Sequence, residues 1–124
     1  MASHEKHHHI NYIEFPSENR EHLARSRAFF GDVFGWKWQM WGDDYADTHE
    51  SGVSCGLTAA EERSPTPLVV MYSADLEATR ARVLEAGGSL TRDIFEFPGG
   101  RRFHFREPGG IELAVWSDVD VSHP

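Results

Sequence analysis

The sequence predicts an α+β fold made of two similar βαβββ modules. Strand and helix patterns occur twice in the same order, and a proline-containing break at residues 59–66 separates the two series. A chain of 124 residues is long enough for one domain, so both modules are expected to share it. Because each helix would cover one sheet face, the modules are expected to form a curved mixed sheet around a ligand-binding cleft.

The first module is expected at about residues 10–58. The stretch INYIEF at 10–15 alternates in the manner of a half-buried strand, with Ile13 and Phe15 on one face. An amphipathic helix follows and ends near Gly35, with helical spacing at Leu23, Arg27, Phe30 and Phe34. Three short strand candidates come next, WKWQMW at 36–41, YADTHES at 45–51 and GVSCGLT at 52–58.

The second module is expected at about residues 67–117. PLVVMYS is the first strand and ADLEATRARVLEAGG contains the helix, while three further strands are expected at SLTRDIFEF, RRFHFRE and IELAVWS. A constant offset of 53 residues aligns the two helices, pairing Leu23 with Leu76 and Gly35 with Gly88. FPGG at 97–100 fits either a hairpin turn or a mobile loop. Residues 1–9 are His-rich and expected to be flexible.

Composition and charge exclude several partners. The net charge is −8, with 20 acidic against 12 basic residues, so no surface for nucleic acid is expected. No apolar run approaches the roughly 18 residues of a membrane span, and the first residues lack a secretion signal. The chain is therefore expected to be soluble and cytoplasmic, without a membrane partner. The single cysteine, Cys55, is expected to be buried and unreactive.

Four segments, in order, resemble the vicinal oxygen chelate superfamily of glyoxalase, bleomycin-resistance and dioxygenase proteins. They are INYIEFP, RAFFGDVFGW, DLEATRARVLEAGG and FPGGRRFHFREPGGIELAVW, and the resemblance extends from about Ile10 to Ser117. It implies paired βαβββ modules, a pocket lined by the sheets and a homodimer. The second segment resembles the end of the family's first helix, and the last resembles its closing strand.

Metal-using members of this superfamily hold a divalent ion with His, Gln or Glu side chains from several strands. The resemblance places Tyr12 and Ala114 at two of these positions, and the fifth strand contains no His. No metal or other cofactor is therefore expected. Glu14, Glu112 and His104 could still surround an ion, although strand-facing acids and histidines more often serve as hydrogen-bonded polar lining.

Strand alternation predicts which side chains face the cleft. The ligand-binding residues are expected to combine aromatic, acidic and basic groups: Tyr12, Glu14, Trp38, Trp41, Arg102, His104, Glu112 and Trp116. Burial of Trp38 in the core or in a dimer interface remains an alternative. His104 is the candidate general acid or base, and Glu14 and Glu112 are candidate catalytic carboxylates that could orient it.

The leading hypothesis is a metal-independent homodimer that sequesters a planar or aromatic metabolite or antibiotic, as bleomycin-resistance proteins do. The alternative is a glyoxalase-like lyase or isomerase, with or without a divalent metal. A third hypothesis is a subunit whose aromatic patch contacts only protein. Fold alone does not decide among these hypotheses, because one fold supports many functions.

Overall fold

The computed structural model describes residues 6–119, and these contain eight strands and two helices. The chain divides into two compact units, which we call the N-terminal unit (residues 12–68) and the C-terminal unit (residues 6–11 and 69–119). Strand, helix and three further strands follow one another twice along the chain. The predicted α+β class with two βαβββ modules is confirmed. None of the helices in residues 6–119 is long and apolar enough to cross a bilayer.

The first module is formed by β1 (Ile10–Pro16), α1 (Arg20–Phe34), β2 (Gln39–Met40), β3 (Tyr45–Thr48) and β4 (Ser54–Thr58). Its strands lie in the order β2-β3-β4-β1, with β1 parallel to β4 and the other pairs antiparallel. The Asn19 side chain caps α1 by accepting a 2.8 Å hydrogen bond from the backbone N–H of His22. Gly35, at φ 77°, ends the helix because glycine adopts this left-handed conformation without strain.

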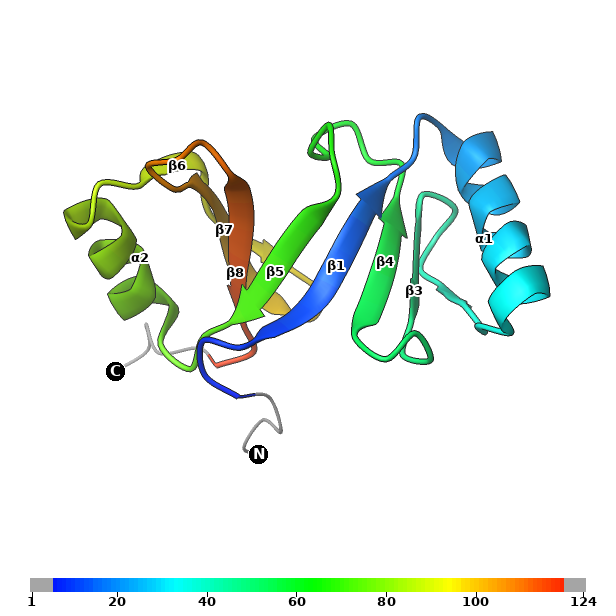
Figure 1. Cartoon of the computed structure of the whole chain (residues 1–124), viewed down its shortest axis with the longest axis horizontal. Helices are drawn as coiled ribbons and strands as arrows, with labels where there is room; N and C mark the ends of the chain where they lie inside the picture. Colours follow the sequence, from blue (N-terminus) through cyan, green and yellow to red (C-terminus); the bar gives the residue numbers. More distant parts are fainter. Residues whose placement is uncertain (1–5, 120–124) are drawn as a thin grey trace. The chain divides into compact units, whose positions relative to one another are not determined.

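Helix α1 covers one face of this sheet (Figure 1). Leu23 from the helix packs on Ala46 and Leu57 from the strands, and Phe15, Phe30 and Trp38 close the cluster. Neighbouring residues in a strand point to opposite faces. Glu14 and Tyr45, which adjoin Phe15 and Ala46, therefore lie on the face that the helix leaves uncovered, which we call the helix-free face.

The second module consists of β5 (Leu68–Tyr72), α2 (Leu76–Glu85), β6 (Ser89–Phe97), β7 (Gly100–Arg106) and β8 (Glu112–Ser117). Its strand order, β5-β8-β7-β6, matches that of the first module. Asp75 caps α2 through a 3.1 Å hydrogen bond from the backbone N–H of Ala78. Phe97 pairs with Gly100, so FPGG forms a tight hairpin turn rather than a long loop.

Helix α2 covers one face of its own sheet (Figure 1). Leu76, Phe103, Phe105 and Val115 are buried together there. The alternation of RRFHFRE and IELAVWS predicted this orientation, and it is confirmed for both strands. Arg102, His104 and Trp116 consequently lie on the helix-free face of the C-terminal unit.

The two helices differ more than the sequence alignment predicts. Helix α1 has 15 residues and α2 has 10, so the constant offset of 53 is wrong at the helix ends. The strand predicted at 36–41 is also shorter, because β2 contains only two residues. Aromatic packing gives the reason: the rings of Trp36 and Trp38 lie 5.4 and 6.1 Å from that of Phe30 on α1, away from strand pairing.

Part of the His-rich N-terminus lies outside the described residues, which begin at Lys6. The rings of His7 and His8 stack with centroids 3.7 Å apart. His7 Nδ1 accepts a 2.9 Å hydrogen bond from the backbone N–H of Ala74, and His8 Nε2 lies 2.9 Å from the hydroxyl of Thr79. Burial, followed by the neighbouring His7, lowers the pKa of His8 from its usual value. The neutral ring is therefore favoured at this position.

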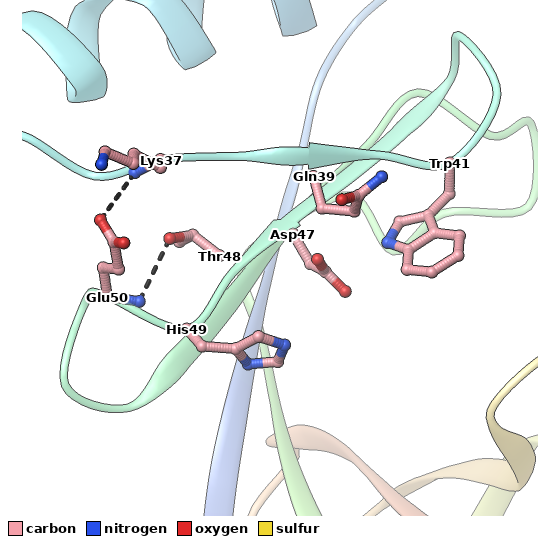
Figure 2. Close-up of a pocket in the computed structure, with 7 residues that line it drawn as sticks. All are labelled: Lys37, Gln39, Trp41, Asp47, Thr48, His49 and Glu50. Carbon is pink, nitrogen blue, oxygen red and sulfur yellow. Dashed lines mark hydrogen bonds between the residues drawn. The ribbon is translucent and has the colours of Figure 1, made fainter.

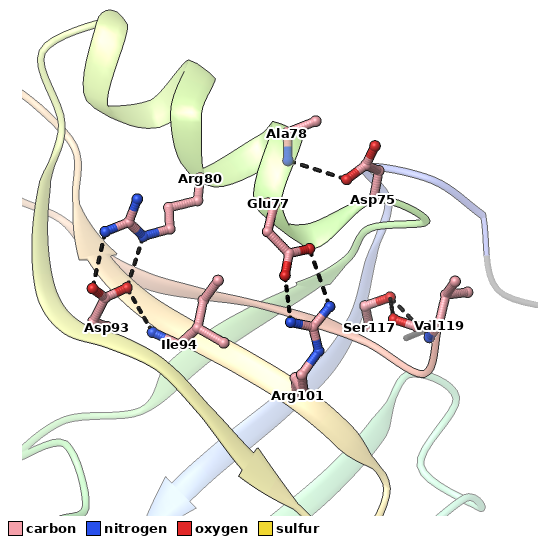
Figure 3. A network of polar contacts seen from close by, with 9 residues as sticks. All are labelled: Asp75, Glu77, Ala78, Arg80, Asp93, Ile94, Arg101, Ser117 and Val119. Atoms are coloured by element: carbon pink, nitrogen blue, oxygen red, sulfur yellow. Dashed lines mark hydrogen bonds and ion pairs between the residues drawn. The ribbon is translucent and has the colours of Figure 1, made fainter. Parts of the chain in front are cut away.

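Two ion pairs connect α2 to its sheet (Figure 3). Arg101 on β7 donates hydrogen bonds of 2.5 and 3.1 Å to the carboxylate of Glu77 in the first turn of α2. Arg80 donates bonds of 2.7 and 2.9 Å to Asp93 on β6. The Arg101 side chain is only 13% exposed, so water screens its pair less than it screens most surface pairs.

We predict that Arg101 and Glu77 are energetically coupled. A double-mutant cycle with Arg101→Met and Glu77→Gln, measured by urea unfolding, should give a coupling of roughly 1 kcal/mol because the pair is bidentate and partly buried. The pair Arg25–Glu21 on α1, with side chains 69% and 71% exposed, is the matched control. Equal coupling free energies in the two cycles would contradict the idea that partial burial strengthens the Arg101–Glu77 pair.

Candidate functional site

The helix-free face of the C-terminal unit has a row of aromatic and basic side chains. Arg102 on β7 pairs with Phe95 on β6 and with Trp116 on β8, and Trp116 pairs with Tyr72 on β5. Directly paired residues in a sheet point to the same face and come into contact. The row therefore places a guanidinium between two half-buried rings, Phe95 and Trp116.

A second guanidinium, that of Arg92, lies over Phe95. The Cζ atom of Arg92 is 3.5 Å from the centroid of Phe95, and Arg102 is 5.5 Å from Phe95 and 5.7 Å from Phe97. At these distances the positive charge is attracted to the ring faces. We call Arg92, Phe95, Phe97, Arg102 and Trp116 the arginine–aromatic face.

The edge of this face is held in a defined orientation. The indole N–H of Trp116 donates a 3.1 Å hydrogen bond to the amide oxygen of Asn11, and its ring meets that of Tyr72 edge-on at 5.2 Å. The hydroxyl of Tyr72 donates a 2.6 Å bond to Asp118. Fixing the ring before a ligand arrives lowers the entropy lost on binding.

His104 lies next to the arginine–aromatic face, on the same side of the sheet. It is 3% exposed, it pairs with Arg92 and Ala114 on the flanking strands, and its ring meets Phe95 edge-on at 5.6 Å. Glu112, the proposed orienting carboxylate on the same sheet, accepts a 2.6 Å hydrogen bond from Thr91. The structure thus places His104 beside an aromatic ring and Glu112 beside a hydroxyl.

The helix-free face of the N-terminal unit contains a chain of hydrogen bonds. Tyr45 donates to the buried carboxylate of Glu14 at 3.0 Å, and its oxygen lies 2.5 Å from that of Tyr12. A phenol has only one proton, so Tyr12 must be the donor to Tyr45. Burial, with the charge of Glu14 next, raises the pKa of Tyr45 far above its usual value and keeps this phenol protonated.

Gly56 makes space for the two phenols. It pairs directly with Glu14 on β1, and a Cβ atom at this position would collide with the hydroxyls of Tyr12 and Tyr45. Sequence reasoning proposed Tyr12 and Glu14 but missed Tyr45 and Gly56. Alternation along β3 around buried Ala46 would have placed Tyr45 on this face.

An open groove of about 330 Å³ lies at the β2–β3 edge of the same unit (Figure 2). Trp41, which is 56% exposed, is the one residue of its lining that the sequence proposed. Trp38 packs in the helix-side core and takes no part in the helix-free face. The missed lining residues are Lys37, Gln39, Asp47, Thr48, His49 and Glu50.

The positions that the family resemblance assigns to metal ligands do not offer a suitable donor set. The Tyr12 hydroxyl is hydrogen-bonded to Tyr45, Ala114 presents a buried methyl group, and β5 contains neither imidazole nor carboxylate. Within residues 6–119, no three His, Cys, Asp or Glu side chains are grouped to hold an ion. Because divalent metals need several such ligands, the residues at these positions do not fit a divalent ion.

Two modules with strand order β2-β3-β4-β1 and β5-β8-β7-β6 define the class of paired βαβββ proteins. The family model of the Glyoxalase/Bleomycin resistance protein/Dioxygenase superfamily matches residues 8–115, so the chain belongs to this superfamily. No curated protein matches the sequence.

Solved structures share the fold at low sequence identity. A Mn(II)-bound glyoxalase from Novosphingobium aromaticivorans is 23% identical with a TM-score of 0.64, over 89% of this chain and 38% of that one. Methylmalonyl-CoA epimerase from Mycobacterium tuberculosis is 13% identical with a TM-score of 0.66, over 97% and 94%. A superfamily member from Vibrio splendidus 12B01 is 18% identical with a TM-score of 0.67, over 86% and 96%.

We predict that Gly56→Ala destabilises the protein by roughly 1–3 kcal/mol, because the added methyl group displaces two hydrogen-bonded phenols. Thermal or urea unfolding measures the effect. Removing both hydroxyls, by Tyr12→Phe with Tyr45→Phe, should reduce the additional cost of Gly56→Ala. An unchanged cost in that background would show that the hydroxyls are not what fills the space.

Proposed function

We propose that the protein binds and sequesters a planar organic molecule without a metal ion, in the manner of the bleomycin-resistance members of its superfamily. The arginine–aromatic face carries this proposal. Its half-buried rings offer flat apolar surface, and Arg92 and Arg102 offer guanidinium donors beside it. A homodimer in the cytoplasm is part of the same proposal. The bound molecule would be a toxic metabolite or antibiotic, against which sequestration gives protection.

The chemistry of this face favours a planar ligand with an acidic group. A flat ring stacks on Phe95, Phe97 or Trp116, while a carboxylate or phenolate pairs with a guanidinium in a bidentate geometry. The Arg92 guanidinium lies over the face of Phe95, with its Cζ atom 3.5 Å from the ring centroid, where its positive charge is attracted to the ring. An acidic group on a ligand that stacks on these rings would therefore lie within reach of a guanidinium.

Binding of 2-naphthoate tests the proposal. We expect fluorescence quenching of Trp116 and a dissociation constant about 10-fold weaker in Arg102→Met, because one charge-assisted contact is lost. Arg106→Met on the same strand is the matched control, since Arg106 is exposed and donates to the carbonyl of Gly110 instead. Cyclohexanecarboxylate should bind more weakly than 2-naphthoate. Equal affinity for the two acids, or equal effects of the two substitutions, would refute the stacking role.

A lyase or isomerase is the second candidate function, and the hydrogen-bond chain in the N-terminal unit favours it. A C–H group next to a substrate carbonyl could give its proton to the Tyr12 oxygen. In the same step the Tyr12 proton would move to Tyr45, and the Tyr45 proton would move to Glu14. The electron pair of the broken C–H bond would move into the carbonyl as an enolate. Return of the proton to carbon would then restore all three groups.

Exchange of the C2 proton of methylmalonyl-CoA in D₂O, followed by proton NMR, tests this second function; the substrate is chosen because the epimerase shares the fold. If the chain is catalytic, exchange should exceed the buffer rate and fall by roughly 100-fold or more in Glu14→Gln and Tyr45→Phe. Arg25→Gln, which changes an exposed residue of α1, should leave the exchange rate unchanged. Exchange at the buffer rate would leave binding as the supported function.

A further inference from the structure

The groove at the β2–β3 edge has a chemical character unlike that of the arginine–aromatic face. Gln39 on β2 pairs with Asp47 on β3, so the two side chains lie next to each other on the helix-free face. Figure 2 shows the indole of Trp41 and the imidazole of His49 on either side of the Asp47 carboxylate. The groove thus combines an exposed ring, just after β2, with a carboxylate on β3, and the backbone N–H of Trp41 donates a 2.9 Å hydrogen bond to the carbonyl of Tyr45.

The hydrogen-bond acceptors in this groove remain available to a ligand. Among residues 6–119, no hydrogen bond or ion pair engages the carboxylate of Asp47. The side-chain amide N–H of Gln39 donates to the carbonyl of Met40 at 3.1 Å, so the amide oxygen is the group that Gln39 can offer. A ligand with donor groups and positive charge fits both acceptors.

The remaining lining residues are occupied in supporting the groove. Glu50 accepts a 3.0 Å hydrogen bond from the backbone N–H of Lys37, and its own backbone N–H donates to the hydroxyl of Thr48 at 3.2 Å. His49 Nδ1 lies 2.9 Å from the hydroxyl of Ser54. These contacts hold the loop after β3 in place, so that the groove is formed before a ligand binds.

We infer that this groove is a binding site for an organic ammonium ion, with the Trp41 ring and the Asp47 carboxylate as its two recognition groups. An ammonium or quaternary ammonium group is attracted both to an indole face and to a carboxylate. The net charge of −8 favours the approach of a cation over that of an anion. The lining contains two carboxylates, Asp47 and Glu50, and one basic side chain with a permanent charge, Lys37. The negative charges therefore outnumber the positive one.

This site is independent of the proposed function, because its residues all belong to the N-terminal unit and the arginine–aromatic face belongs to the C-terminal unit. The two sites also require opposite charge in their ligands. Failure of naphthoate binding would therefore leave the cation site intact, and loss of the cation site would leave naphthoate binding intact.

Titration with benzyltrimethylammonium, followed by the indole N–H signal of Trp41 in ¹H–¹⁵N NMR spectra, tests the inference. We expect that signal to shift, with saturation in the millimolar range, and to shift less with benzyl alcohol or benzenesulfonate at the same concentrations. Asp47→Asn should weaken binding of the cation about 5-fold or more, since an exposed cation–π contact alone is weak. Trp41→Leu should weaken it similarly, as read from the remaining signals around the groove.

Asp43→Asn is the matched control, because this substitution removes the same charge from a neighbouring turn. Asp43 pairs with Arg20 and does not line the groove. It should leave the affinity within about 2-fold, the change expected from a distant, screened charge. The same NMR spectra report whether each variant is folded. Equal binding of benzyl alcohol, or equal weakening by Asp43→Asn and Asp47→Asn, would overturn the inference.

Discussion

Each sheet has one face covered by a helix and one face without it, and the other structural features depend on this constraint. The apolar clusters around Leu23 and Leu76 hold the helices on their sheets. Since strand residues alternate between faces, burial of Phe103 and Phe105 obliges Arg102 and His104 to point the other way. Core packing therefore sets the positions of the side chains that can meet a ligand, before any polar interaction is considered.

The alternation of apolar and polar residues was sufficient to predict from the sequence which side chains of β7 and β8 point to the helix-free face. The strands IELAVWS and RRFHFRE are long and regular, so a shift by one residue would have buried Arg102 and exposed Phe103. The fold class was also predictable, because the order of elements repeats and each helix begins at an Asn or Asp cap. Trp38 was harder to place, since it precedes a two-residue strand and its orientation follows from ring packing on Phe30.

Contacts between strands distant in sequence account for what could not be predicted. Tyr45 meets Glu14 only because β4 lies between their strands and contributes a glycine there. Phe95 meets Arg102 only because the β6–β7 pairing shifts register between Arg92 and Phe95. The residues around a glycine or a register shift do not reveal which side chains on the neighbouring strands it brings together. Those contacts depend on how the strands pair.

The chain formed by Tyr12, Tyr45 and Glu14 also shows how hydrogen bonding compensates for the burial of an acid. Glu14 is 5% exposed, and a buried carboxylate is costly unless a donor compensates for lost water. Tyr45 supplies that donor, and burial together with the charge of Glu14 raises its pKa, which favours the protonated phenol. Tyr12 in turn donates to Tyr45, so the chain satisfies its own members. A side chain at position 56 larger than glycine would break this arrangement, which makes the phenols and the glycine a single structural solution.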